Sequence, residues 1–326
     1  MNTQAPPNAM SLVARIARLP WKEWVIYIGM VIVLLYFAIT LGSTFLNTTT
    51  LVNVVTQSTQ IAVMAVGTVL VLSLGEIDLS IGSTVALASL VAAVTLHATQ
   101  QWWVAALAGL ATGAIVGAVN GAFITALKLP SFLVTLATMG LVAGLSQQIT
   151  GLQSVPVTDP TFVWIFGGGT ILGIPILMIW TISALLLGIH VLRQRRFGAR
   201  ILAVGNNASA AAVSGIRVNR IRMSVFVISG LTAALAGILY AGRLSGATYT
   251  LGTTDMMSVL AAVIVGGTAM TGGKGTMLGA IVGSLFMSTI NYGLLLAGLT
   301  VAQQMIVRGI IILIAISLSP HGTSGR

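Results

Sequence analysis

Charged residues are so scarce in this chain that long stretches contain none. The 326 residues include 15 Lys and Arg and 5 Asp and Glu, which together make up 6% of the sequence, whereas a typical soluble domain carries about 25%. So few charges cannot cover a water-soluble surface of this size, and 56% of the residues are hydrophobic. We therefore expect an all-α integral membrane protein.

Ten apolar runs approach the length of about 20 residues that a helix needs to cross a bilayer. The eighth run is short and interrupted by glycine, so it is either a full span or a broken, re-entrant one. A membrane domain is predicted over 25–318, with short cytoplasmic segments over 1–24 and 319–326. The ten runs are Val25–Leu46, Leu51–Leu74, Ile81–His97, Val104–Leu127, Phe132–Ile149, Ile174–Leu192, Met223–Gly242, Met256–Thr271, Thr276–Ala297 and Val301–Leu318.

The basic residues set the orientation of these spans. If the N-terminus is cytoplasmic, ten spans return the C-terminus to the cytoplasm, and 13 of the 15 Lys and Arg fall in cytoplasmic segments. Arg243 falls outside and Arg308 lies within the last span. The positive-inside rule accounts for this distribution, so the net charge of +10 does not require a nucleic acid partner. The apolar run after residues 1–24 is too long for a secretory signal, which predicts an uncleaved first span.

Two stretches of the chain echo each other. Leu74–Asp78 and Leu251–Asp255 both read Leu-Gly-x-x-Asp, and each opens a predicted span. Glycines also recur at every fourth position in two later spans, which favours close packing of helices in either half. An inverted repeat relating spans two to five to spans seven to ten explains the echo; the alternative is that glycine-rich apolar helices resemble one another by composition. The glycines are Gly113, Gly117 and Gly121, and Gly275, Gly279 and Gly283.

Two of the five acidic residues lie in the segment Gly75–Ser83, between long apolar runs. The glycines predict a helix break, and Asp78 is expected to N-cap the following span through a side-chain oxygen. Glu76, Asp78 and Ser80 are therefore candidates for a structural break or for part of a gate. No other catalytic group accompanies the carboxylates, which argues against acid–base catalysis.

A long basic loop over 193–222 contains an alanine-rich run that predicts a short helix on the cytoplasmic surface. Asn207 suits its N-cap and Gly215 its C-terminal end. Two interpretations stay open, a lipid-headgroup anchor or a docking helix for a soluble partner. The candidate docking residues are Asn207, Ala208, Ser209, Ala210, Ala211, Ala212, Val213, Ser214 and Gly215.

A third glycine-rich segment, Gly266–Gly279, contains Gly273-Lys274-Gly275-Thr276. The spacing of a phosphate-binding loop fails here, because glycine follows the lysine and no strand precedes the segment. We expect a tight cytoplasmic turn between spans eight and nine.

Taken in order, Gly75–Ser83, Arg200–Ile216 and Gly266–Gly279 resemble the permeases of ribose-type ATP-binding-cassette sugar importers. Family members carry a stretch like Gly-Gly-Ile-Asp-Leu-Ser-Val-Gly-Ser, in which Glu76 replaces the second glycine here. The second segment corresponds to the family's coupling helix, where Ser209 stands at a place that is often acidic. The departure at Ser209 leaves open whether one charge contact to the ATPase is missing.

The resemblance implies a permease of the bacterial inner membrane rather than an enzyme. It implies three protein partners: an ATPase that uses ATP and Mg, a periplasmic sugar-binding protein and a second permease copy, as a homodimer. The chain itself is expected to hold no cofactor. Sugar would cross by alternating access.

Neutral polar residues in the spans are candidates for the sugar pathway, because unpaired polar groups are costly in a bilayer. The alternative for each is an interhelical hydrogen bond. Arg308 has no obvious acidic partner within the spans. The pathway candidates are Asn53, Gln57, Gln60, Asn120, Gln147 and Asn291, with Gln148, Tyr292, Gln303 and Gln304 as further members.

Other transporter classes fit the sequence less well. An ion-coupled secondary transporter would need acids in mid-span, whereas these acids fall at span ends or in loops. A permease for branched-chain amino acids would need a site for a charged zwitterion, whereas the spans offer amides and hydroxyls. A metal or thiol enzyme is not expected, since cysteine is absent and the three histidines are scattered.

Overall fold

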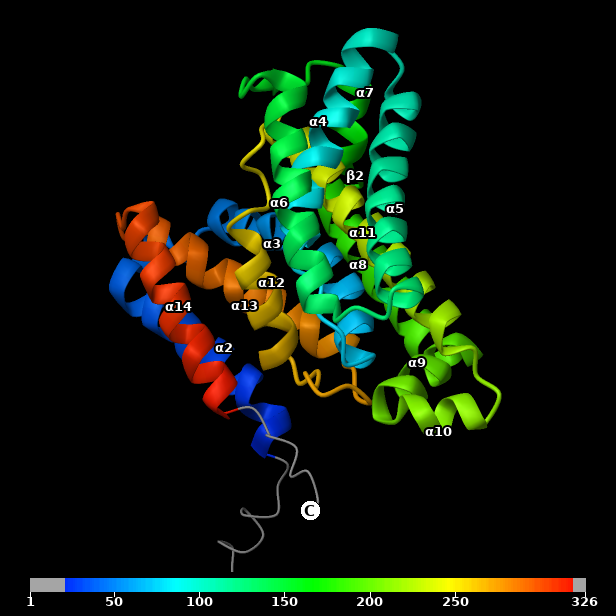
Figure 1. Ribbon diagram of the computed structural model, residues 1–326. Helices are drawn as coiled ribbons and strands as arrows, with labels where there is room; N and C mark the ends of the chain where they lie inside the picture. The colour runs from blue at the N-terminus through cyan, green and yellow to red at the C-terminus, as the bar shows by residue number, and fades with distance from the viewer. Residues whose placement is uncertain (1–20, 319–326) are drawn as a thin grey trace, which may run out of the picture.

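The computed structural model describes residues 21–318, and helices dominate it (Figure 1). Each of the ten predicted runs contains a helix. Among the described residues, eight helices are long and apolar enough to cross a membrane. The ten helices are α2 (Trp21–Leu41), α3 (Thr48–Ser73), α4 (Ile81–Thr99), α5 (Trp102–Ala126), α6 (Ser131–Thr150), α8 (Ile176–Ile189), α11 (Val218–Leu244), α12 (Asp255–Val265), α13 (Met277–Leu296) and α14 (Val301–Leu318).

The eighth predicted span is a short helix, as its glycines suggest. α12 has 11 residues and ends before Gly266, and an irregular segment leads to α13. At about 1.5 Å of rise per residue, a helix of this length covers only about half of the hydrocarbon core. The prediction of a full span over Met256–Thr271 is therefore wrong, and the broken alternative is confirmed.

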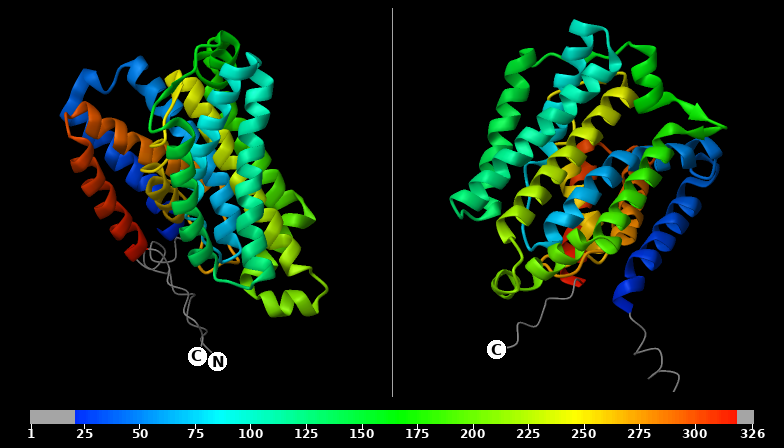
Figure 2. Two further views of the ribbon diagram at one scale, coloured as in Figure 1. Left: turned by 45° about the horizontal axis from the view of Figure 1, so that its top comes forward. Right: turned by 90° about the vertical axis from the view of Figure 1, so that its right-hand side faces the viewer.

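The connection from α6 to α8 holds structure that the sequence did not suggest. It contains β1 (Val155–Pro156), α7 (Pro160–Val163), the π-helical turn η2 (Trp164–Gly168), and the strands β2 (Thr170–Ile171) and β3 (Ile174–Pro175). β1 pairs with β4 (Gly246–Ala247), which follows α11. β2 and β3 form a small hairpin that projects from the bundle in the right-hand view of Figure 2.

The buried centre of the bundle is formed by α3, α4 and α11. Within their apolar windows, 83%, 72% and 67% of the residues are buried, against 22% in α6 and in α8. The outer helices thus present most of their apolar surface outward, as helices facing lipid do.

Glycines allow the central helices to approach closely. A Cβ atom added to Gly113 or Gly117 of α5 would overlap backbone atoms of α11, and one added to Gly279 or Gly283 of α13 would overlap backbone at α12 and its C-terminal turn. Small residues serve this purpose in membrane helices. The prediction that these glycines pack helices together is confirmed for the helical members of both series, whereas Gly275 lies in the loop before α13.

The packing follows the pattern that an inverted repeat predicts. Exchanging α3 with α11, α4 with α12, α5 with α13 and α6 with α14 turns each contacting pair among them into another contacting pair. The echoed motifs also match in backbone shape, because Gly75 and Gly252 have φ values of +75° and +76°. The two halves therefore share an architecture in addition to a short sequence motif.

Candidate functional site at the basic end

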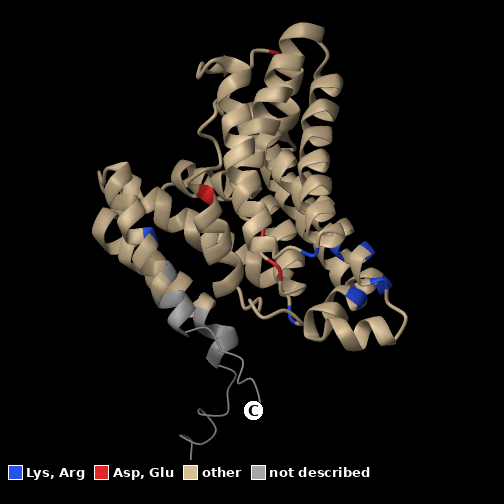
Figure 3. Ribbon diagram, viewed as in Figure 1, with Lys and Arg blue, Asp and Glu red and all other residues tan. Residues whose placement is uncertain are grey.

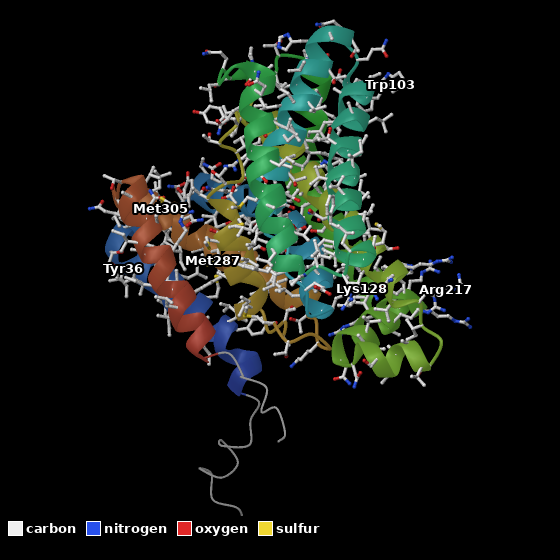
Figure 4. The ribbon with its side chains drawn as sticks, in the orientation of Figure 1. Tyr36, Trp103, Lys128, Arg217, Met287 and Met305 are labelled. Atoms are coloured by element: carbon white, nitrogen blue, oxygen red, sulfur yellow. The ribbon has the colours of Figure 1, made fainter. Side chains whose placement is uncertain are left out.

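One end of the helix bundle collects most of the described basic residues (Figure 3). We call it the basic end: it comprises α9 (Arg196–Asn206), α10 (Ala208–Val213) and the loops 74–80 and 266–276. Lys128 and Arg217 lie at this end, whereas Trp103 lies toward the opposite one (Figure 4). The first described turn of α2 and the last turn of α14 also point toward the basic end (Figure 1).

The segment 193–222 is more helical than predicted. Helix α9 precedes the expected short helix and buries Gly198, Ile201 and Val204, while α11 already begins at Val218 rather than at Met223. The apolar positions of α9 are spaced as on one helix face. They explain why this basic segment packs against the bundle instead of forming a loop.

Helix α10 forms as its local sequence predicts. The Asn207 Oδ1 atom accepts a hydrogen bond of 2.9 Å from the Ala210 amide, which satisfies a free N–H of the first turn. Gly215 follows with φ +83°, a conformation that favours glycine. Both predicted ends of the helix are therefore confirmed.

The candidate docking residues divide between two sides of α10. Ala211 is only 5% exposed and packs inward, and Ala208 is half-buried. Val213 is 91% exposed, and Ser209, Ala210 and Ala212 are also exposed. The outward side is thus small and nearly uncharged, with one protruding apolar residue.

The loop between α3 and α4 is organised by Asp78. Its Oδ1 accepts hydrogen bonds from the amide and hydroxyl of Ser80 at 3.0 and 2.6 Å, and its Oδ2 accepts one of 2.7 Å from the Ser229 hydroxyl of α11. Ser80, not Asp78, is the N-cap residue of α4, so the predicted direct capping by Asp78 is wrong. Burial raises the pKa of the Asp78 carboxyl, while the hydrogen bonds from Ser80 and Ser229 act in the opposite direction.

This network extends to two further helices. The Asn120 side chain of α5 donates to the Ser80 hydroxyl at 2.8 Å. Ser131 of α6 accepts a hydrogen bond from the Ile77 amide. The loop 74–80 is therefore fixed from three sides, which fits a structural break held in one conformation.

Glu76 forms an ion pair with Arg222 at the start of α11. The Glu76 Oε1 and Arg222 Nε atoms are 2.8 Å apart, and the two side chains are 12% and 30% exposed. The Nε atom makes no hydrogen bond of good geometry within the described part of the chain, so the attraction is electrostatic rather than directional. The acidic residue that departs from the family pattern thus ties the loop 74–80 to the basic segment.

The predicted pathway residues are not gathered in one place. Asn53 donates to the Tyr292 hydroxyl at 3.0 Å, linking α3 to α13. Gln57 is half-buried, and Gln147 is exposed near the end of α6 beside Gln148. Gln303 is exposed, and the buried candidates are Gln60, Asn120, Asn291 and Gln304. The Gln60 amide has no hydrogen-bond partner among the described residues.

The Arg308 Nε atom donates a hydrogen bond of 3.4 Å to the Gln304 carbonyl, and no ion pair joins Arg308 to an acid among the described residues. Its guanidinium nevertheless lies within electrostatic range of Asp255 at the start of α12, as does that of Arg243. Asp255 Oδ2 also accepts a hydrogen bond of 2.6 Å from Tyr240. The sequence already marked this acid, because Asp255 belongs to the second Leu-Gly-x-x-Asp motif.

Within residues 21–318, no group of three or more His, Cys, Asp and Glu side chains is placed to hold a metal ion. The two described histidines serve separate contacts: His97 bonds the Pro156 carbonyl, and His190 bonds Gln194 and Arg195.

Comparison with known proteins finds a family profile and several individual relatives. Residues 50–316 match the profile of a family described as the permease component of the branched-chain amino acid transport system. The chain is 38% identical over 290 residues to the ribose import permease protein RbsC of Escherichia coli strain K12, covering 87% of this chain and 90% of that protein. It is 34% identical to RbsC of Bacillus subtilis, covering 90% and 91%, and 33% identical to the L-arabinose permease protein AraH of Azospirillum brasilense, covering 91% and 88%.

Proposed function

This chain belongs to the family of permeases of bacterial ATP-binding-cassette sugar importers, and on that premise we propose that it carries a monosaccharide or a related polyol across the inner membrane, powered by a separate ATPase. It is a multi-pass inner-membrane protein with eight described helices of spanning length. Its relatives are transport permeases and not enzymes.

We place the basic end in the cytoplasm. Lys and Arg concentrate on the cytoplasmic side of membrane proteins, and the described chain gathers them around α9 and α10 (Figure 3). In this orientation α10 faces a soluble ATPase, and the strands and the hairpin of residues 155–175 face the periplasm, where a binding protein delivers sugar.

The observation that carries the proposal is the surface of α10. The helix is capped at both ends and fixed to the bundle through Ala211, while its other side stands free with Val213 protruding. A lipid anchor would place basic side chains on the free side, whereas this side carries small neutral groups that fit into a groove. We therefore favour α10 as the docking site of the ATPase over the interpretation as a lipid-headgroup anchor.

The proposed transport cycle follows from docking of the ATPase on α10. ATP binding closes the ATPase pair, displaces α10, and rocks the helices between outward and inward openings around a pathway shared with a second copy of the chain. The pathway candidates identified from the sequence remain candidates in this proposal. ATP and Mg belong to the ATPase, and no cofactor is assigned to this chain.

A sugar is favoured over an amino acid as cargo. The matched family profile is described by branched-chain amino acid transport, whereas the relatives at 33–38% identity over most of the chain are described as ribose and arabinose permeases. A zwitterion would need paired charges along its path, and the predicted pathway positions carry amides instead.

Reconstitution tests this function directly. The chain is placed in proteoliposomes with its ATPase and binding protein, and uptake of labelled pentoses, hexoses, polyols and leucine is measured with ATP, without ATP and with an ion gradient alone. We expect ATP-dependent uptake of a sugar or polyol. Uptake of leucine alone, or uptake driven by the ion gradient, would overturn the proposal.

The docking role of α10 has its own test. Replacing Val213 with Asp puts a charge on the exposed side, and Asn219→Asp adds the same charge to an exposed position just beyond it on α11. We expect Val213→Asp to lower ATPase binding and uptake about tenfold, as at interface positions that lose a central contact, and Asn219→Asp to lower neither. Equal behaviour of the two variants would remove α10 from the interface.

A further inference from the structure

Three segments that are far apart in the sequence meet at the basic end through their backbones. The Ser73 carbonyl, at the end of α3, accepts a hydrogen bond of 3.0 Å from the Gly273 amide in the loop between α12 and α13. The last turn of α9 lies against both groups. A Cβ atom added to Gly205 would overlap the Ser73 carbonyl oxygen and would lie 2.7 Å from the Gly273 nitrogen.

The contact leaves no room for side chains. A Cβ atom on Gly272 would lie 2.6 Å from the Gly205 carbonyl oxygen and 2.9 Å from the Gly75 nitrogen. One on Gly275 would overlap the hydroxyl of Ser73. We call the segments 73–75, 205–206 and 271–275 the backbone junction.

The backbone junction connects the segment that precedes α10 to one loop from each of the two repeats. Segment 205–206 leads directly into α10 through Asn207. Segment 73–75 opens the loop that Asp78 and Glu76 hold, in one repeat, while 271–275 separates α12 from α13 in the other. Both repeats thus contact segment 205–206, which directly precedes α10.

When two backbone segments are in direct contact, a displacement of one segment displaces the other by nearly the same amount. Side chains can change rotamer when a neighbour moves, but close-packed main chain cannot. A shift of α9 toward the bundle must therefore move Ser73 and Gly273 with it, or break the hydrogen bond between them.

Resting on the proposed function, we propose that the backbone junction is the coupling element that passes movement of α10 to both repeats at once, with Gly205, Gly272 and Gly275 as its positioning residues. The junction would then explain why the α3–α4 break and the α12–α13 break lie at the basic end. Binding of the ATPase to α10 is a separate property that the junction does not determine.

Gly275 provides the test, because the overlap between a Cβ atom added there and the Ser73 hydroxyl can be removed by a second substitution. The Ser73 hydroxyl that a Cβ atom on Gly275 would overlap is buried and has no hydrogen-bond partner among the described residues. The next atoms, Val69 Cγ1 and Leu192 Cδ2, lie 3.1 and 3.2 Å from the added Cβ atom and belong to flexible side-chain ends. Ser73→Ala therefore restores room for an alanine at 275 without removing another interaction.

Four chains are compared in proteoliposomes with the ATPase and binding protein: wild type, Gly275→Ala, Ser73→Ala, and the double variant. The readout is sugar taken up per ATP hydrolysed. We expect Gly275→Ala to hydrolyse ATP and retain the ATPase but to lower this ratio about tenfold, a change of the size that overpacking gives. Ser73→Ala should match the wild type, and the double variant should recover most of the ratio. Gly144→Ala is the matched control, since no atom of the described residues lies within 4 Å of a Cβ atom there.

The outcomes separate the junction from the proposed function. If the wild type fails to take up sugar with ATP, the proposed function fails. If the wild type takes up sugar and Gly275→Ala shows the same uptake per ATP hydrolysed, the coupling role of the junction is wrong. This includes the case in which Gly275→Ala lowers uptake and ATP hydrolysis in proportion. The same holds if the double variant stays as uncoupled as Gly275→Ala.

A spectroscopic measurement keeps the inference testable should Gly275→Ala not fold. The sequence has no cysteine, so spin labels at Arg200→Cys on α9 and at Met270→Cys are unique, and both positions are exposed. Dilution with unlabelled chain leaves one labelled copy per assembly. We expect the distance between the labels to stay unchanged between the nucleotide-free and ATP-trapped states, because α9, which leads into α10, moves together with the loop. A shifted distance would overturn the inference.

Discussion

Asp78 offers the sharpest test of how the α3–α4 break is held. Its carboxylate accepts three hydrogen bonds, two from Ser80 and one from Ser229. Asp78→Ala removes both acceptor oxygens in a buried place and leaves the three donor groups unpaired. At about 1 kcal/mol for each bond, the free energy of unfolding falls by about 3 kcal/mol.

The change from Asp78 to Asn gives a matched comparison. Asparagine keeps one oxygen at the position that accepts both bonds from Ser80, and the Ser229 hydroxyl can turn to accept from the new amide. The neutral side chain also avoids the cost of burying a charge. We expect a loss below about 1 kcal/mol.

The assay is thermal unfolding in detergent at one fixed heating rate, followed by size-exclusion chromatography, since membrane proteins often unfold irreversibly. In soluble domains of 150–250 residues, about 1 kcal/mol shifts the midpoint by roughly 2–4 °C. Asp78→Ala should therefore lower the midpoint by about 6–12 °C, and Asp78→Asn by less than about 4 °C. Uptake by Asp78→Asn should stay close to that of the wild type.

The pH dependence has a definite sign. Burial raises the pKa of Asp78, so the folded chain binds this proton more tightly than the unfolded chain, and wild-type stability falls as the pH rises through the folded-state pKa. The Asp78→Asn variant lacks this titration, and its stability relative to wild type should rise with pH. Equal stability of Asp78→Ala and wild type, or loss of uptake in a stable Asp78→Asn, would refute the structural role of Asp78.

Three further predictions follow from local contacts at the same end and in the core. Glu76→Gln and Arg222→Gln should show a coupling energy of about 1 kcal/mol in a double-mutant cycle of thermal unfolding, because the pair is only partly exposed; additive effects would show that the ion pair contributes nothing. Gly113→Leu should prevent stable folding, because even a Cβ atom there overlaps the backbone of α11, whereas Gly140→Leu, which faces open space, should express normally; equal expression levels would contradict the close crossing. Asn207→Ala should weaken ATPase binding by about 1 kcal/mol through loss of the cap, while Asn207→Asp, which keeps an acceptor, should not; identical affinities would show that the cap is unimportant.

Local signals in the sequence predicted local structure well. The cap at Asn207 and the end at Gly215 depend on residues within one short helix, so the alanine-rich run between them predicted α10 correctly. The ten helices could be located from hydropathy alone, since lipid and buried helices both demand apolar runs. The glycine series of α5 and α13 predicted close packing because no side chain is available at those positions.

Contacts between distant segments could not be predicted in the same way. Asp78 is the expected acid at a helix start, but its second oxygen bonds Ser229, which lies 151 positions later in the chain. The proximity of Arg308 to Asp255 could not be predicted either, because the two residues are far apart in sequence and only the packing of α12 against α14 brings them near each other. The backbone junction combines glycines from three segments, each of which alone resembles an ordinary turn.

The central claim is that α10 receives a soluble ATPase and drives the helix bundle from that side of the membrane. The most direct test is site-specific crosslinking from a single cysteine at Val213→Cys, with Leu172→Cys as control, because both side chains are over 90% exposed and Leu172 lies in the β2–β3 turn. The account predicts that a short crosslinker joins position 213, and not position 172, to the ATPase in assembled transporters. An ATPase adduct at position 172, or none at position 213 in a complex that hydrolyses ATP, would contradict it.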